Sequence, residues 1–286
     1  MANLKEIRNR ISSISSTMQI TSAMKMVSAA KLKKAQDAIT AMRPYADKLT
    51  ELLQNLSASL DADSGSTFAD ERPVNKVLVV AITSNRGLCG AFNSNIIKQC
   101  TALIHESFSG KQVDFVVIGK KANDILSKNY HIHANHSDVF DHLTFENVAV
   151  IAEQLMELFK EGTYDRIELV YNKFKNAATQ IVMSEQFLPI VPSESAEGSN
   201  ADYIFEPSEA EIVEQLIPKS LKTQLYKAVR DSFASEHGAR MTAMHKATDN
   251  ATELKEQLTL TYNQARQAAI TNEILEIVGG AEALSN

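Results

Sequence analysis

A heptad repeat of apolar residues runs through the first sixty residues of the chain. It keeps one register, and its apolar positions are Leu4, Ile7, Ile11, Ile14, Met18, Leu32, Ala35, Ile39, Met42, Ala46, Leu49, Leu53, Leu56 and Leu60. A repeat of this length in one register predicts a long helix with a coiled-coil seam. At about 1.5 Å per residue, a helix over 4–60 is about 85 Å long. Polar residues interrupt the seam once, at Thr21, Lys25 and Ser28.

A second helical tract follows Pro207 and extends to about Val278. Its expected seam is Met244, Ala247, Ala251, Leu254, Leu258, Thr261, Ala265, Ala268, Asn272 and Leu275. Small residues at a seam let a second helix approach closely. We therefore expect the two tracts to pair antiparallel within one chain. The alternative is a coiled-coil scaffold protein that associates with itself through the heptads.

The segment between the two tracts has the pattern of an α/β domain. Strands are expected at 76–83, 113–118 and 166–172, helices at 91–108, 120–127 and 147–160, and an antiparallel edge strand at 179–187. Alternating strands and helices predict a Rossmann-like domain with a mostly parallel sheet. The expected division is a helix over 1–60, a linker over 61–75, the α/β domain over 76–207 and a helix over 208–286.

Composition bounds the class of protein. With 286 residues, 44% apolar and 22% charged, the chain is an ordinary globular protein of one or two domains. No apolar run reaches the roughly 18 residues of a membrane span, and the N-terminus lacks the apolar core of a signal peptide. Two cysteines do not make a disulfide framework. We expect a cytoplasmic protein that reaches a membrane only through partners.

Charge is distributed unevenly along the chain. Residues 1–48 carry nine Lys or Arg and three Asp or Glu, a net charge of +6. Because the whole chain has a net charge of −6, residues 49–286 carry −12. The basic cluster Lys31, Lys33 and Lys34 is either a solvated helix face or a collar facing an acidic partner. Lys25 inside the seam favours the collar.

The loop Ser84–Ala91 follows an expected strand and opens a helix, which is where Rossmann-type domains bind phosphate. Its glycines, Gly87 and Gly90, have Gly-x-x-Gly spacing in place of the three-glycine fingerprint, and no Walker motif occurs in the chain. We interpret the loop as a tight turn with Arg86 as a possible protein contact. A nucleotide-dependent α/β enzyme with helical appendages is the alternative function.

One cluster of metal-ligand residue types occurs between the expected second and third strands. It consists of His131, His133, His136, Asp138, Asp141 and His142. The spacing matches no recognised zinc site, so solvated loop histidines are the expected interpretation and metal binding stays open. The cysteines and serines show no catalytic context. No catalytic residue, metal ligand or cofactor is assigned.

Three stretches together resemble the gamma subunit of the F-type ATP synthase, bacterial type. They are 20–32 (ITSAMKMVSAAKL), 84–93 (SNRGLCGAFN) and 235–281, which begins SEHGARMTAM and ends ITNEILEIVGGA. The similarity covers nearly the whole chain in order and spacing. It includes the loop residues Arg86, Gly87, Cys89 and Gly90.

This resemblance implies a non-catalytic rotor. A member of this family is a central stalk that couples proton or sodium movement through a membrane ring to ATP synthesis or hydrolysis, and regulates both. The implied partners are the alpha and beta subunits, the epsilon subunit and the membrane c-ring, with no nucleic acid. The implied location is the cytoplasmic face of the bacterial plasma membrane, as a peripheral subunit.

The resemblance also implies contact residues. Positions that match contacts with beta-subunit loops are Met24, Lys25, Arg240, Gln267, Thr271 and Glu276, and those that match the foot at the membrane ring and epsilon are Tyr203 and Glu206. The break in the first seam is then expected to be a face that leaves its partner helix to meet beta subunits. Asn85 stands where the family usually has Asp. Gly238 lies within the second helix, at a cost of about 1 kcal/mol relative to Ala unless a close contact requires it.

Overall fold

The computed structural model describes residues 4–59, 68, 72–190 and 209–285. These residues form two compact units, one from the segments up to Ser28 and from Met241 onward, and one from Ala29–Arg240. We call them the helical unit and the α/β unit. Most of the predicted linker 61–75, together with Tyr203 and Glu206, lies outside the described residues. The predicted domain boundaries stay predictions.

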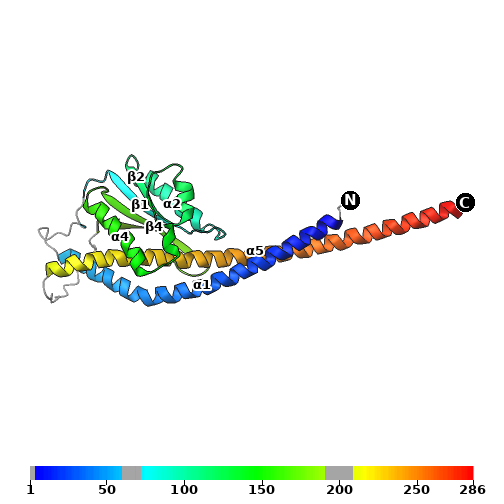
Figure 1. Cartoon of the computed structure of the whole chain (residues 1–286), viewed down its shortest axis with the longest axis horizontal. Coiled ribbons are helices and arrows are strands. Elements are labelled where there is room, and N and C mark those ends of the chain that lie inside the picture. Colours follow the sequence, from blue (N-terminus) through cyan, green and yellow to red (C-terminus); the bar gives the residue numbers. More distant parts are fainter. Residues whose placement is uncertain (1–3, 60–67, 69–71, 191–208, 286) are drawn as a thin grey trace. The chain divides into compact units, whose positions relative to one another are not determined.

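Two long helices confirm the coiled-coil part of the fold class. Helix α1 is Leu4–Ser59 and helix α5 is Glu209–Ser285 (Figure 1). Pro44 and Pro218 both lie inside these helices, so neither proline marks a helix end. None of the described helices is long and apolar enough to cross a membrane.

Within the helical unit the two helices pair antiparallel. Three contacts show the direction: Arg8 Nη2 to Tyr262 Oη at 2.6 Å, Thr21 Oγ1 to Thr248 Oγ1 at 2.8 Å, and Lys25 Nζ to His245 Nδ1 at 3.4 Å. As the residue number rises on α1 it falls on α5, which confirms the expected antiparallel arrangement.

The break in the first seam faces the partner helix, so the prediction that it turns away is wrong. Thr21 and Ser28 are buried, and the hydroxyl of Thr21 shares a hydrogen bond with that of Thr248. A short hydroxyl side chain satisfies its hydrogen bond across the seam, and Thr21 Oγ1 also contacts the Met18 carbonyl oxygen at 3.1 Å. The interruption is therefore a polar layer within the coiled coil.

The second seam follows a register that was only half predicted. Met244 and Ala251 are buried as expected, whereas Leu254 is 46% exposed. Further along the covered face, half-buried Lys255 and Tyr262 take the places expected for Leu254 and Thr261, and Thr248 is half-buried beside the expected Ala247. Thr248 and Tyr262 occupy these positions because they meet polar groups of Thr21 and Arg8.

The sheet of the α/β unit has five strands. They are β1 (Lys76–Ile82), β2 (Gln112–Ile118), β3 (Ile132–Asn135), β4 (Arg166–Phe174) and β5 (Gln180–Leu188). Their order is β3-β2-β1-β4-β5; the first four are parallel and β5 pairs antiparallel with β4. The expected mostly parallel sheet with an antiparallel edge strand is confirmed. Strand β3 was not predicted, so the loop setting assigned to the histidine cluster is wrong for His133.

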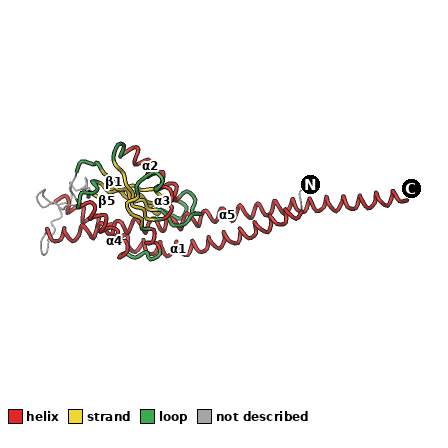
Figure 2. The backbone as a smooth tube through the Cα atoms, turned by 45° about the horizontal axis from the view of Figure 1, so that its top comes forward, coloured by secondary structure: helices red, strands yellow, loops and turns green. Residues whose placement is uncertain are grey.

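Helices cover both faces of this sheet (Figure 2). Helices α2 (Phe92–Glu106) and α3 (Lys120–Leu126) pack on one face against alternate residues of β1 such as Val77 and Val79. Helices α4 (Phe145–Lys160) and α5 pack on the other, against Leu78 and Val80. Successive strand residues point to opposite faces, so a strand buried on both sides reads as a continuous apolar run.

Gly238 on α5 lies where the backbone of another segment comes close. A Cβ built there would be 3.2 Å from both the Cα and the carbonyl oxygen of Ala177. That spacing is tighter than ordinary van der Waals contact. A close contact therefore explains why glycine interrupts a long helix at this position.

Candidate functional site

The loop that follows β1 lies at the switch point of the sheet. Strand β1 has β2 on one side and β4 on the other, and in α/β sheets ligands bind beyond the carboxyl ends of strands at such a point. The loop is Ser84–Ala91. Its chemistry therefore decides whether this part of the fold can accept a ligand.

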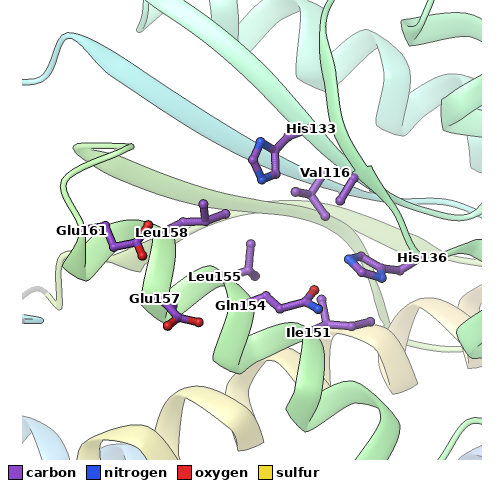
Figure 3. A pocket seen from close by; sticks show the side chains of 10 residues that line it. Val116, His133, His136, Ile151, Gln154, Leu155, Glu157, Leu158 and Glu161 are labelled. Atoms are coloured by element: carbon purple, nitrogen blue, oxygen red, sulfur yellow. The ribbon is translucent and has the colours of Figure 1, made fainter.

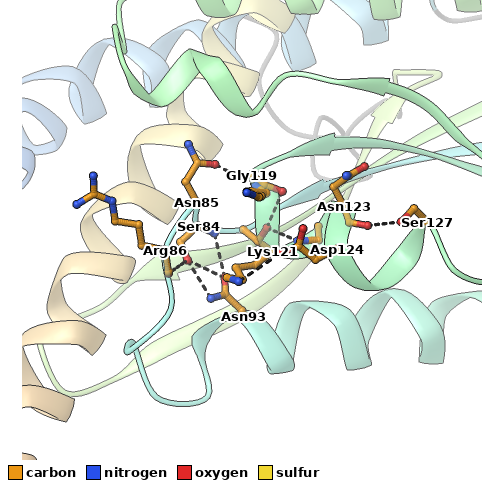
Figure 4. A network of polar contacts seen from close by, with 12 residues as sticks. Ser84, Asn85, Arg86, Asn93, Gly119, Lys121, Asn123, Asp124 and Ser127 are labelled. Atoms are coloured by element: carbon orange, nitrogen blue, oxygen red, sulfur yellow. Dashed lines mark hydrogen bonds and ion pairs between the residues drawn. The ribbon is translucent and has the colours of Figure 1, made fainter.

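Hydrogen bonds within the loop hold it as a compact turn (Figure 4). The Ser84 hydroxyl donates to the Arg86 carbonyl oxygen at 2.6 Å, and the Ser84 amide donates to Asn93 Oδ1 at 2.9 Å. Asn93 Nδ2 in turn donates to Ser84 Oγ at 2.9 Å and to Cys89 Sγ at 3.2 Å. Gly90 has a φ of 59°, a conformation that glycine adopts without strain.

Asn85 joins this loop to the next two segments along the edge of the sheet. Its Nδ2 donates to the Ser137 carbonyl oxygen at 2.8 Å, and its Oδ1 accepts from the Lys120 amide at 2.9 Å. A carboxylate could accept the second bond but has no proton to donate in the first. The amide at this position therefore has a structural reason.

Arg240 of α5 closes the loop from the other side. Its Nη2 donates to the carbonyl oxygens of Arg86 at 3.1 Å and Gly87 at 3.2 Å, and its Nη1 donates to Glu236 Oε1 at 2.6 Å. Arg240 is only 7% exposed. Burial raises the pKa of Glu236, and the neighbouring guanidinium of Arg240 lowers it in opposition. The loop carbonyls point at a cation of the same chain, which favours the packed-turn interpretation over nucleotide binding.

The two cysteines are buried thiols. Burial raises the pKa of Cys89, and it raises the pKa of Cys100 to about 12. The thiolate is the reactive form of cysteine, so neither side chain is an activated nucleophile. Cys89 instead packs within the loop and accepts a hydrogen bond from Asn93.

The last part of α5 exposes apolar side chains. The hydrogen bond between Arg8 and Tyr262 lies near the start of α1. Beyond it on α5, every residue from Arg266 to Ala281 is exposed. The large apolar side chains of this stretch are 48% to 68% exposed, and they are Ile270, Ile274, Leu275, Ile277 and Val278. Contiguous exposed apolar side chains mark a surface that another molecule covers.

Comparison with known proteins identifies the family. A sequence model described as ATP synthase matches residues 3–284. The ATP synthase gamma chain of Flavobacterium johnsoniae is 73% identical over 286 residues, which cover all of both chains. The chain belongs to the ATP synthase gamma-chain family. The gamma chain of Christiangramia forsetii is 67% identical over 285 residues, again with both chains fully covered.

Solved structures agree with the fold of this family. A chain from the Euglena gracilis mitochondrial ATP synthase, in an assembly described as OSCP/F1/c-ring, has a TM-score of 0.70 at 23% identity and covers 98% of this chain and 94% of its own. A chain from the central stalk and c-ring assembly of the Tetrahymena thermophila mitochondrial enzyme has a TM-score of 0.59 at 25% identity, covering 80% and 99%. The chain is accordingly a gamma subunit of the ATP synthase central stalk.

The contact residues implied by the gamma-chain family fall into separate groups. Met24 and Lys25 lie on α1 at the level of His245, with Lys25 half-buried against that side chain. Gln267, Thr271 and Glu276 are all exposed, and at about 1.5 Å per residue Gln267 is about 33 Å further along α5 than His245. The structure does not bring these two groups together.

Arg240 differs from the other implied contacts because its guanidinium N–H groups donate to acceptors within the same chain. The structure brings Arg240 together with the loop residues Arg86 and Gly87, because it donates to their carbonyl oxygens. Both loop residues are exposed. Its role as a contact of another subunit stays a prediction. Sequence reasoning missed Glu236 as its ion-pair partner, although the spacing of four residues on a helix was a usable signal.

The histidine cluster is spread over an edge of the α/β unit. His131 Nδ1 is 3.5 Å from Asp114 Oδ1, and His133 Nδ1 is 3.2 Å from the Tyr164 hydroxyl. In the part of the chain that the structure describes, no three His, Cys, Asp or Glu side chains are placed to hold one metal ion.

Proposed function

We propose that the chain is a rotating shaft that couples proton or sodium translocation through a membrane ring to ATP synthesis and hydrolysis at sites on alpha and beta subunits. Membership of the gamma-chain family supports this assignment. The observation that carries it is the exposed apolar end of α5. We expect a shaft that other subunits surround to have apolar side chains that its own chain leaves exposed, because the surrounding subunits bury them.

The size of this uncovered surface supports a lasting interface. Fully burying a large aliphatic side chain stabilises by about 1.5–3 kcal/mol. Five such side chains lie between Ile270 and Val278, each about half exposed or more. Partial burial of all five therefore contributes several kcal/mol toward the cost of assembly with other subunits.

Polar side chains within the same stretch supply the specific contacts of the proposal. Gln267, Thr271 and Glu276 are exposed among the apolar residues and carry hydrogen-bond donors and acceptors. We assign them to beta-subunit loops, with Met24 and Lys25 as a second level of contact. Arg240 contributes by holding the Arg86 to Gly90 loop in place. Tyr203 and Glu206 stay predicted foot contacts.

The remaining parts of the proposal concern the assembly. Its partners are the alpha, beta and epsilon subunits and the membrane ring, and catalysis takes place on alpha and beta. In this assignment the chain regulates ATPase activity and ion flow, and is a peripheral subunit at the cytoplasmic face of the bacterial plasma membrane. The bacterial gamma chains that it resembles support this placement.

Deletion of residues 271–286 tests the proposal in the reconstituted complex. We expect weaker copurification with alpha and beta and a loss of ATP synthesis that exceeds the loss of hydrolysis, because the apolar stretch no longer seats the shaft. The control deletes only residues 282–286 and keeps the five exposed apolar side chains between Ile270 and Val278. Full coupled ATP synthesis by the longer deletion would show that this end of α5 does not carry the function.

A further inference from the structure

A cavity lies between α4 and the β2 and β3 side of the sheet (Figure 3). Its volume is about 230 Å³. The residues that line it are Val116, His133, Ala134, His136, Ile151, Gln154, Leu155, Glu157, Leu158 and Glu161. Nothing in the proposed shaft function uses this cavity.

The floor of the cavity is apolar and its size is small. Val116, Ile151 and Leu155 are buried at its base. Pockets for cofactors and other drug-sized ligands are usually about 300–1,000 Å³. A volume of about 230 Å³ is below that range, so the cavity suits a single side chain with an aliphatic stem better than a whole cofactor.

The rim of the cavity presents two carboxylates without a cation. Glu157 lies in the last turn of α4 and Glu161, four residues on, caps the end of this helix. Within the described residues neither side chain forms an ion pair or a hydrogen bond. Like charges four residues apart on a helix destabilise it. A cation placed between them would remove that repulsion.

The histidines on the sheet side add acceptors. Tyr164 has one hydroxyl proton, which it donates to Asp114 Oδ2 at 2.9 Å, so its oxygen accepts from His133 Nδ1 at 3.2 Å. This assigns the proton to Nδ1 and leaves Nε2 of neutral His133 as an acceptor. Burial lowers the pKa of His136, which favours the neutral ring and leaves it one hydrogen-bond acceptor. The polar lining is therefore rich in acceptors and negative in charge.

Strand β3 borders the cavity and is the outermost strand of the sheet. It pairs with β2 on one side and with no other described strand. An edge strand presents unpaired backbone groups, and an extended peptide can add to it while its alternate side chains enter neighbouring pockets. His133 and Ala134 of β3 themselves line the cavity, so an added strand would direct side chains toward it.

We propose that this cavity receives a lysine or arginine side chain from an extended segment of a partner protein that pairs with the edge of β3. The aliphatic stem of that side chain packs on Val116, Ile151 and Leu155, and its cationic end binds Glu157 and Glu161. The proposal concerns a face of the α/β unit that the shaft function leaves unassigned. It does not depend on rotation or on ATPase activity.

Binding of the fluorescently labelled full chain to an array of blocked heptapeptides tests this inference. The peptides have the form Thr-Val-Thr-Xaa-Thr-Val-Thr, with every natural amino acid placed in turn at the centre. We expect Arg and Lys at the centre to bind at least tenfold more tightly than Glu or Leu. Hydrogen exchange should slow at the β3 amides when the Arg peptide is bound. Preference for an acidic or apolar centre would overturn the proposal.

Two matched variants and a small cation complete the test. The double variant Glu157→Gln and Glu161→Gln should lose the Arg and Lys preference, whereas Glu146→Gln, an exposed carboxylate in the first turn of the same helix, should keep it. Equal preference in both variants would contradict the assignment. Agmatine supplies the same guanidinium without a backbone; if it binds as tightly as the Arg peptide, the site takes a free organic cation and the partner segment is excluded.

Discussion

The guanidinium of Arg240 forms an ion pair with the buried carboxylate of Glu236 and donates three hydrogen bonds to backbone carbonyl oxygens of the loop. Replacing Arg240 by Met removes the cation and leaves Glu236 buried without a partner, for which about 3–5 kcal/mol of unfolding free energy is the usual cost. We expect a loss of this size for Arg240→Met in urea unfolding of the full chain, because the loop carbonyls of Arg86 and Gly87 lose their donors in the same variant.

The matched control is the pair Arg10 and Glu6, which has the same spacing on a helix but is exposed at both ends. Exposed pairs contribute about 0–1 kcal/mol, so Arg10→Met should change the unfolding free energy by no more than that. Adding Glu236→Gln to Arg240→Met should recover part of the loss. Equal effects of Arg240→Met and Arg10→Met would contradict the role assigned to the buried pair.

His237 makes stability depend on pH. Burial lowers its pKa to about 4, with Arg240 and Lys31 acting in the same direction. A group whose pKa is lowered on folding contributes stability above its unfolded value and loses it as the pH falls. We therefore expect the unfolding free energy to fall by about 1 kcal/mol per pH unit between 6.5 and 4 from this residue.

Comparing the full chain with His237→Gln isolates this contribution from other titrating groups. Glutamine can still accept a hydrogen bond from Arg240 but cannot be protonated in this range. Urea unfolding at several pH values between 7 and 4.5 should show a shallower decline for the variant. Parallel curves for the two proteins would rule out His237 as the titrating group.

Residue-level prediction from sequence reached the loop but not its partners. The motif around Arg86 to Gly90 was recognised from its letters, because a glycine-rich turn after a strand has a local signature. The bonds from Arg240 end on backbone carbonyls far away in the chain, and backbone acceptors leave no trace in a sequence. The one signal of this network in the sequence is the spacing of four residues between Glu236 and Arg240, which favours an ion pair on a helix.

At the scale of elements, the polar layer of the coiled coil gives a testable coupling. Thr21 and Thr248 share a hydrogen bond across the seam, and each hydroxyl also contacts a carbonyl of its own helix. Removing one partner of a buried hydrogen bond usually costs about 0.5–1.5 kcal/mol, whereas replacing both by apolar groups of the same shape can be neutral. We expect Thr21→Val and Thr248→Val each to destabilise and the double variant to approach the original stability.

A double-mutant cycle followed by far-UV circular dichroism during urea unfolding measures this coupling. Thr259→Val serves as the control, because Thr259 is exposed on α5 and, among the residues that the structure describes, bonds to the Lys255 carbonyl oxygen of its own helix. It should change stability by no more than about 0.5 kcal/mol. Additive losses in the cycle would mean that the two hydroxyls do not interact in solution.

Elements with long apolar patterns were predictable and short polar ones were not. Strand β1 has a continuous apolar run, and strands β2 and β4 are mostly apolar and buried, so their sequences identify them. Strand β3 has four residues, two of them His133 and Asn135, and takes its conformation from pairing with β2. The seam of α5 was wrong at Leu254 and Thr261, because Lys255, which lies on the covered face, looks like a surface residue when α1 is not considered.

At the scale of the whole molecule, the sequence similarity predicted the fold class and the family, and it also predicts contacts of α5 with other subunits. Gln267 and Thr271 are exposed on the last part of that helix, so they contribute little to the stability of the chain itself. Their value lies in bonds to other subunits.

The double variant Gln267→Leu and Thr271→Val removes these hydrogen-bonding groups while keeping side chains of similar size. If each bond contributes about 0.5–1.5 kcal/mol to the assembled state, the variant loses about 1–3 kcal/mol, or about five- to 150-fold in a rate or equilibrium that depends on both. We expect ATP synthesis by the reconstituted complex to fall about fivefold or more, with unchanged urea unfolding of the isolated chain. The control is Gln257→Leu with Thr259→Val, the same residue types exposed earlier on α5. Equal ATP synthesis by the two double variants would show that Gln267 and Thr271 are not the contacts through which the shaft acts.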